Sequence, residues 1–391
     1  MKKAIIMVVV LALVGAGVYF WVIPTFFSAA TSTGIGSSPV ATPQETPPVP
    51  GTNTQDFVDK AIAAFPMKDM LNAGQSVTNI LKNLDYGAAQ NMLPQIDKCN
   101  SAFAEMQSAV NSETNAAPED FRPDRKIPNF LAAQTMGKLL VVKGMGMEGQ
   151  GKLDKAVNNY LLAAQFGSVF AGKNTLLIQK LIAIALEKNA YKPLKEFTIR
   201  HPDDVNNLKR IISALEKADQ KRIPFTEPLL GEKKMLFYAL QHREQYAKED
   251  STLAQLTDAD ANRILTEGEK VYTYAIQSYT MPYPQLVKED PQSKLPGMMN
   301  EIHPLLGNSV PNYTAAYIRE LYMITDNHQI RVMAALQLYH QDKKVYPNSL
   351  EDLFPNYLTT VPKDPFSDAN FIYGRVRDTF YLYSIGPDLN D

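Results

Sequence analysis

The sequence has little of what most chemical sites are made from. Its single cysteine, Cys99, excludes an internal disulfide framework and a cysteine-rich zinc site. The five histidines are scattered, and a His-Glu-x-x-His metalloprotease motif, a Gly-x-Ser-x-Gly elbow and a complete P-loop are all absent. Because none of these motifs occurs, we predict no catalytic residues, no cofactor and a non-enzymatic protein.

An excess of charge of one sign is lacking as well. The net charge is −2, from 39 basic and 41 acidic residues, and no five like charges follow one another. Binding to phosphate backbones needs a concentrated basic face, so nucleic acid is not expected as a partner. The chain of 391 residues, 45% of them hydrophobic, is long enough for two or three domains with substantial cores.

A long apolar run begins almost at the N-terminus. Residues 4–23 (AIIMVVVLALVGAGVYFWVI) contain no charge, and twenty helical residues span about 30 Å, the thickness of a hydrocarbon core. Trp21 stands near the far end, where aromatic rings favour the membrane interface. Lys2 and Lys3 precede the run and no basic residue follows it before Lys60. These features predict a single-pass anchor in a bacterial inner membrane, with the N-terminus inside and the bulk in the periplasm.

The alternative for this run is a cleaved signal peptide, with the small residues 28–30 as its cleavage site. We favour the anchor because twenty apolar residues exceed the usual core of a signal peptide. Residues 24–55 are rich in Pro, Ser and Thr and hold almost no large apolar residues after the first few, so they are interpreted as a linker.

Residues 56–311 carry the apolar periodicity of helices and few signals of strands. We predict a helical bundle or α-solenoid body, in which helices over 258–279 and from 312 onward are separated by the proline-containing stretch 282–296. One apolar stripe illustrates the pattern: Val205, Leu208, Ile211, Ile212 and Leu215.

A helical hairpin over about 135–170 has a distinctive order of small and aromatic residues. These are Gly144, Gly151, Ala156, Tyr160 and Ala163, at successive spacings of 7, 5, 4 and 3. The spacing resembles a tetratricopeptide repeat, which implies two helices that cross closely at small residues. One copy is visible, whereas such repeats usually stack in threes or more, so a generic antiparallel helix pair stays open as the alternative. The stretch 153–240 also resembles an uncharacterised family of membrane-anchored helical bacterial proteins.

Residues 312–391 predict a small α+β unit after a long helix. Ser349 and Asp352 have the spacing of a capping box and predict a short helix, SLEDLFPNYL. Two β-rich runs, 371–376 and 379–385, flank Arg377-Asp378 and predict a hairpin with one face on the long helix.

In order, the segments of this tail are YHQDKKVYP, SLEDLFPNYL, VPKDPF, FIYGRV and FYLYSIGPDLND. From about residue 330 onward the chain resembles the globular domain of type II secretion major pseudopilins. The resemblance implies calcium in the acidic loop after the last strand, where Asp388, Asn390 and Asp391 supply oxygen atoms. Calcium takes six to eight ligands, so a solvated terminus is the alternative. The sequence departs from the family at Lys344, where a glycine is expected, and in lacking a pilin-type Glu in its anchor.

Three functions follow as hypotheses. The first is a membrane-anchored, extracytoplasmic interaction or scaffold protein that binds protein partners. The second is an accessory component of a type II secretion or pilus-like system, in which the tail docks beside true pseudopilins. The third is an extracytoplasmic hydrolase that uses a dispersed pair of carboxylates in a groove of the body.

Overall fold

The computed structural model describes residues 53–70, 73–112, 120–124, 128–173, 175–248, 250–308 and 310–390. This part of the chain is mainly helical, as the periodicity predicts. The predicted anchor and the linker as far as residue 52 lie outside it. Among the helices that are described, none combines the length and the apolar character needed to cross a bilayer.

The helices of the N-terminal half are α3 (Thr54–Ala64), α4 (Met67–Met70), α5 (Gly74–Asn83), α6 (Tyr86–Ile96), η2 (Asp97–Cys99), α7 (Asn100–Asn111), α8 (Phe130–Gly149), α9 (Leu153–Phe170), α10 (Leu177–Arg200) and α11 (Val205–Gln220). The remaining elements are α12 (Thr226–Gln241), α13 (Arg243–Tyr246), α14 (Ser251–Gln255), α15 (Asp258–Ser278), α16 (Tyr283–Glu289), α17 (Pro291–Ile302), α18 (Pro304–Gly307), α19 (Tyr313–Lys343), η3 (Leu350–Leu353), β1 (Ile372–Val376) and β2 (Thr379–Tyr383).

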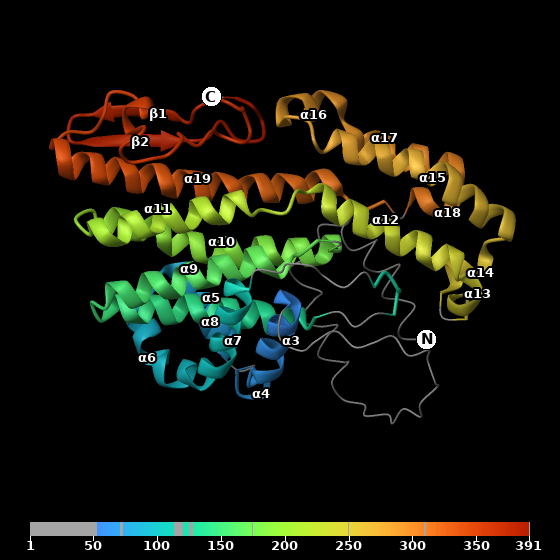
Figure 1. Ribbon diagram of the computed structural model, residues 1–391, viewed down its shortest axis with the longest axis horizontal. Coiled ribbons are helices and arrows are strands. Elements are labelled where there is room, and N and C mark those ends of the chain that lie inside the picture. Colours follow the sequence, from blue (N-terminus) through green and yellow to red (C-terminus); the bar gives the residue numbers. More distant parts are fainter. Residues whose placement is uncertain are drawn as a thin grey trace.

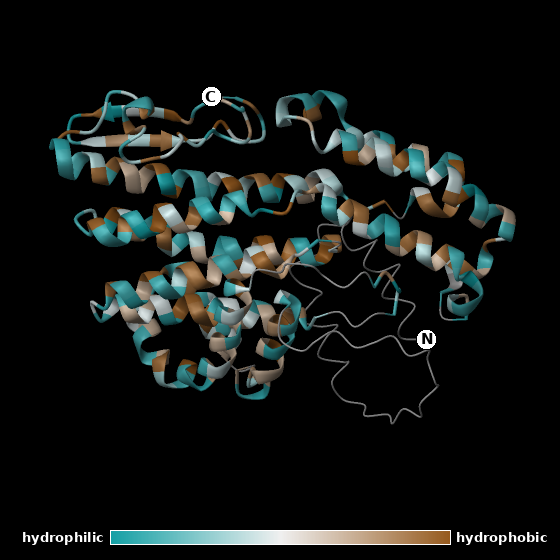
Figure 2. Ribbon diagram, viewed as in Figure 1, coloured by the Kyte–Doolittle hydropathy of each residue, from teal (hydrophilic) through white to brown (hydrophobic). Residues whose placement is uncertain are grey.

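The helices form stacked layers with a side arm (Figure 1). From the lower edge of the view the layers run from α6 and α7 through α8 and α9 to α10, then α11 and α19, with the β-hairpin on top. Helices α12–α18, residues 226–307, project to the right as the arm. The hydrophobic residues gather where α8, α9 and α10 meet (Figure 2), so the main core lies between these layers.

Helices α8 and α9 form the hairpin expected over about 135–170, and α8 begins five residues earlier, at Phe130. A Cβ atom on Gly144 would lie 2.4 Å from the ring of Tyr160 and 3.1 Å from the carbonyl oxygen of Ala156. The two helices therefore approach at a distance that only glycine permits at this position. The likeness to a tetratricopeptide repeat stays a prediction, because the same contact stabilises any closely packed helix pair.

The prediction that prolines interrupt the helices over 282–296 is wrong. Helices α16 and α17 occupy most of that stretch. Pro284 and Pro291 stand in the first turns of their helices, where the missing N–H group would have no helical partner in any case. Pro296 lies inside α17, one turn beyond its start.

The long helix α19 belongs to two cores. Leu321, Met323 and Ile330 pack in the main core of the body. Val332 and Leu336 pack instead in a second core with tail residues such as Leu353 and Phe371, and with Leu208 of α11. The tail, residues 344–390, is thus built on the same helix that closes the body.

The tail has the predicted hairpin but not the predicted helix. Strands β1 and β2 pair in antiparallel register around Arg377-Asp378. The segment SLEDLFPNYL forms only the 3₁₀ turn η3, although its capping box is present. Phe354 precedes Pro355 and is extended, as residues before proline usually are, so the helix cannot continue. The cap of α19 is the left-handed residue Lys344, with φ of 59°.

The two faces of the hairpin differ. Phe380 and Leu382 pack against the second core, whereas Tyr381, Tyr383 and Val376 are exposed on the outer face. Gly374 lies opposite Tyr381, and a Cβ atom there would fall 2.2 Å from the Tyr381 hydroxyl. The tyrosine ring therefore covers the glycine across the two strands.

Candidate functional site

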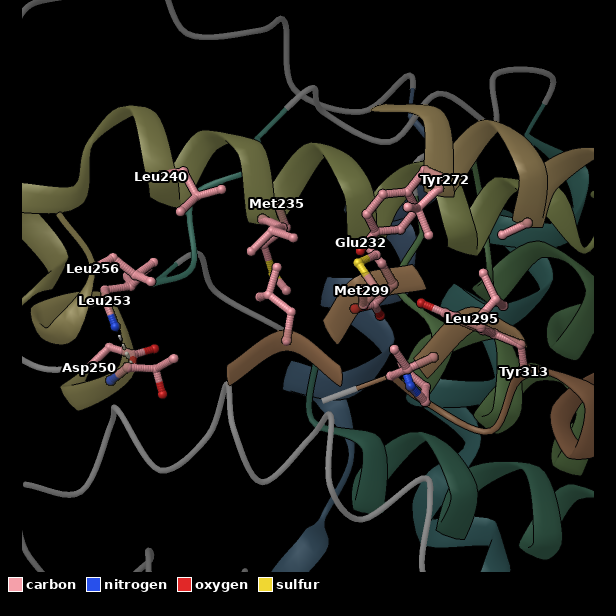
Figure 3. A pocket seen from close by; sticks show the side chains of 17 residues that line it. Glu232, Met235, Leu240, Asp250, Leu253, Leu256, Tyr272, Leu295, Met299 and Tyr313 are labelled. Atoms are coloured by element: carbon pink, nitrogen blue, oxygen red, sulfur yellow. Dashed lines mark hydrogen bonds between the residues drawn. The ribbon is translucent and has the colours of Figure 1, made fainter. Parts of the chain in front are cut away.

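The arm contains the best-defined pocket of the described residues (Figure 3). It lies between α12, α14, α15, α17 and α18 and is closed by the start of α19. Glu232, Tyr272 and Met299 gather at one end, and Asp250, Leu253 and Leu256 lie at the other. The remaining lining residues are Met235, Leu236, Leu240, Thr252, Val271, Ala275, Leu295, Leu306, Val310, Pro311 and Tyr313. The surface presented to an occupant is therefore predominantly apolar.

The two carboxylates of this pocket already have structural roles. Glu232 accepts a hydrogen bond of 3.0 Å from the backbone N–H of Leu177, at the start of α10. Asp250 caps α14 by accepting from the N–H groups of Thr252 and Leu253, at 2.8 and 3.3 Å. A pair of carboxylates acting in hydrolysis needs oxygen atoms that face a substrate, whereas these are directed to the backbone.

The two phenols at the α15 end stay neutral. Burial, reinforced by the nearby charge of Glu232, raises the pKa of Tyr272 far above its ordinary value. Burial likewise raises the pKa of Tyr313, which is hydrogen-bonded to Tyr272. Neither group can act as a base near neutral pH, so they serve as hydrogen-bonding groups in an apolar wall.

The size of the pocket limits what it can bind. Its volume is about 70 Å³. Pockets for cofactors and small-molecule substrates are usually about 300–1,000 Å³, and a dry cavity of about 150 Å³ is needed for benzene. The arm pocket therefore matches a few carbon atoms, such as one apolar side chain of another protein.

A buried row of charged and polar side chains lies between α10, the end of α11 and α19. We call it the polar seam, and its members are Lys180, Glu187, Tyr191, Asp219, Arg222, Glu320, Asn327 and Arg331. Lys180 and Glu320 pair at 2.6 Å with side chains only 5% and 3% exposed. Burial raises the pKa of Glu187, an effect partly offset by the charge of Arg222 and the hydrogen bond from Tyr191. The seam joins body and long helix through charges rather than apolar contacts.

A second buried carboxylate lies where α6, α8, α9 and α10 meet. Glu148 accepts hydrogen bonds from Tyr160 at 2.7 Å and Arg200 at 2.7 Å, and its Oε1 lies 2.8 Å from Nε2 of His201. The Arg200 guanidinium also stacks 3.9 Å from the ring centroid of Tyr86. With three partners inside the fold, Glu148 ties the helix ends together. A single acidic residue within an apolar helix was the signal in the sequence that could have revealed this cluster.

Glycines near the end of α8 match the spacing Gly-x-Gly-x-x-Gly of dinucleotide-binding turns. That fingerprint requires a preceding strand and a tight turn, but Gly144, Gly146 and Gly149 are all helical. A Cβ atom on Gly146 would lie 2.9 Å from the Ala89 carbonyl oxygen, and one on Gly149 would lie 2.6 Å from the Gln90 side chain. These glycines serve helix packing on both sides of α8.

The residues with predicted calcium oxygens are only partly described. Asp388 and Asn390 are exposed, and Asp391 lies outside the described residues. Over the described ranges, three or more His, Cys, Asp or Glu side chains nowhere gather in a geometry that could hold a metal ion. Two side chains provide fewer oxygen atoms than calcium takes, so this site stays a prediction.

The nearby loops are joined by Asp364, which the sequence did not single out. Its carboxylate is buried and accepts from the Ser384 hydroxyl at 2.8 Å, from the Ile385 N–H at 2.9 Å and from the Phe366 N–H at 3.1 Å. The one thiol is inert, because burial raises the pKa of Cys99 to about 11.

Comparison with models of protein families, with curated proteins and with solved structures finds no match to this chain. The resemblances of the body and the tail therefore stay predictions from the sequence.

Proposed function

We propose that the protein is a membrane-anchored, extracytoplasmic interaction protein, whose arm pocket receives an apolar side chain of a protein partner. The observation that carries the proposal is the size and lining of that pocket: about 70 Å³, mostly apolar, with both carboxylates engaged in the fold. The uncharged run at residues 4–23 supports the anchor. A solenoid-like body then serves to carry the arm and the tail outside the membrane.

A photo-cross-linking amino acid at Leu236 of the full chain, in its native membrane, tests this proposal. Leu236 lines the pocket and is half-buried, so an occupant would be captured there. The blocking variant is Ala275→Leu, which adds carbon atoms to a residue of the pocket wall that is 2% exposed. We expect an adduct with one partner, which disappears in the blocking variant while the melting temperature stays within a few degrees.

The matched control carries the same cross-linker at Val287, which is 47% exposed on α16 and does not line the pocket. Equal adducts at both positions, or an adduct that survives Ala275→Leu, would contradict the proposal.

The second candidate is an accessory component of a type II secretion or pilus-like system. The observation that favours it is the hairpin seated on a long helix, with an apolar outer face formed by Val376, Tyr381 and Tyr383. The same cross-linking experiment with the probe at Tyr381 separates the two candidates. Recovery of pseudopilins would favour this role, and recovery of no secretion component would remove it.

A further inference from the structure

His328 occupies the place where body, long helix and tail meet. Its Nδ1 lies 2.7 Å from the carbonyl oxygen of Lys363, in the tail. Its Nε2 lies 3.0 Å from Oδ2 of Asp219, at the end of α11. The side chain is 14% exposed, so water contributes little to the solvation of either nitrogen.

Both partners of the ring are hydrogen-bond acceptors. A backbone carbonyl can only accept, and an ionised carboxylate can only accept. Burial acts to raise the pKa of Asp219, but the hydrogen bond and charge of His328 and the charges of Arg222 and Arg331 outweigh it and lower the pKa to about 2. Asp219 is therefore ionised at any physiological pH. Both contacts are hydrogen bonds only when both ring nitrogens carry a proton, which is the imidazolium form.

We propose that His328 is a pH-sensitive latch, which in its doubly protonated form fastens the tail to the body and on deprotonation releases one of the two contacts. A neutral imidazole has one donor, so either the Lys363 carbonyl or the Asp219 carboxylate then faces a lone pair. Because Nδ1 alone reaches the tail, loss of the Nδ1 contact frees the loop around Lys363.

The other charges around the ring confine the change to the tail. Asp219 also pairs with Arg222 at 3.2 Å and with Arg331 at 3.4 Å. Glu216 of α11 pairs with Arg331 as well, at 3.6 Å. On the tail side, Asp364 follows Lys363 but directs its carboxylate to Ser384, Ile385 and Phe366. Asp219 thus keeps two cationic partners without His328, whereas the Lys363 carbonyl loses its only side-chain donor among the described contacts.

Hydrogen exchange of the full chain, corrected for the intrinsic pH dependence of exchange, measures the latch. We expect the amides of residues 361–366 to exchange about tenfold faster at pH 8.5 than at pH 5.5, as the loss of one charge-assisted hydrogen bond predicts. The variant His328→Gln has no titratable ring and should exchange at one intermediate or fast rate at both values. Amides in α8 and α9 should not change.

The control is His340→Gln, also on α19, where the ring stacks 4.5 Å from that of Tyr346 and is not tied to body and tail together. It should keep the full pH dependence. Nitrogen NMR of labelled histidine gives a second readout, in which both ring nitrogens of His328 are protonated at pH 5.5. Exchange that is equal at both pH values, a pH dependence that persists in His328→Gln, or a single protonated nitrogen at pH 5.5 would each overturn the latch.

Discussion

Two interfaces of the molecule bury similar lengths of helix by opposite means. Between α8 and α9 the contact is made by glycine, alanine and aromatic rings, with Gly144 against Tyr160. Between α10, α11 and α19 it is made by the polar seam, with Lys180 against Glu320. The first interface is stabilised by close packing, which is insensitive to solution conditions. The second depends on ion pairs whose desolvation must be offset by exact pairing.

The difference indicates that the two interfaces should respond differently to mutation. Loss of one member of a buried ion pair leaves a charge without its partner, and removal of both members restores a neutral interior. A close-packed glycine contact has no such second change that repairs it simply. The seam is therefore the place where stability is conditional.

The largest effect is expected for Lys180→Met. It leaves the Glu320 carboxylate, 3% exposed, without its cation and should lower the free energy of unfolding by about 3–5 kcal/mol. The double variant Lys180→Met with Glu320→Leu should recover most of this loss. Urea denaturation followed by circular dichroism measures both. The exposed pair Lys294–Glu289 is the control, and Lys294→Met should have little effect. A double variant as unstable as the single one would contradict this account of the seam.

The apolar interface is tested by the same substitution at two glycines. Gly144→Ala forces a Cβ atom to within 2.4 Å of the Tyr160 ring and should cost about 1–3 kcal/mol. Gly297→Ala, in α17, places the Cβ atom in open space and should stabilise by about 0.5–1 kcal/mol through helix propensity alone. Thermal unfolding of the two variants should therefore shift in opposite directions, and shifts of the same sign would contradict the close contact.

The smallest effect concerns the acid stability of the seam. The pKa of Asp219 is lowered from 3.8 to about 2, so its ionised form stabilises the fold above pH 4 and this contribution is lost as the pH falls from about 4 to 2. The loss amounts to roughly 2 kcal/mol. In Asp219→Asn the contribution is absent at every pH, so the difference in unfolding free energy between the two proteins should shrink over this range. A difference that stays constant from pH 5 to pH 2 would contradict the prediction.

The helical class and the tail hairpin could be predicted from local patterns. Apolar periodicity reported the helices, and the capping residues Ser349 and Asp352 and the two residues between the strands acted locally. The polar seam could not be predicted, because Glu320, Asn327 and Arg331 have the composition of a solvent-exposed helix face. The arm pocket was also hidden, because its walls come from five helices whose contacts are set by tertiary packing.

The composition of α19 has a consequence for the tail as a separable unit. The side of the helix that faces the body buries Glu320, Asn327, Gln329 and Arg331. If α19 and the tail moved away from α10 and α11, the surface uncovered there would be wettable along much of its length, whereas an apolar helix face would be prone to aggregation. A junction of this kind tolerates reversible detachment, and it would let the two parts of the chain diverge or be exchanged independently during evolution.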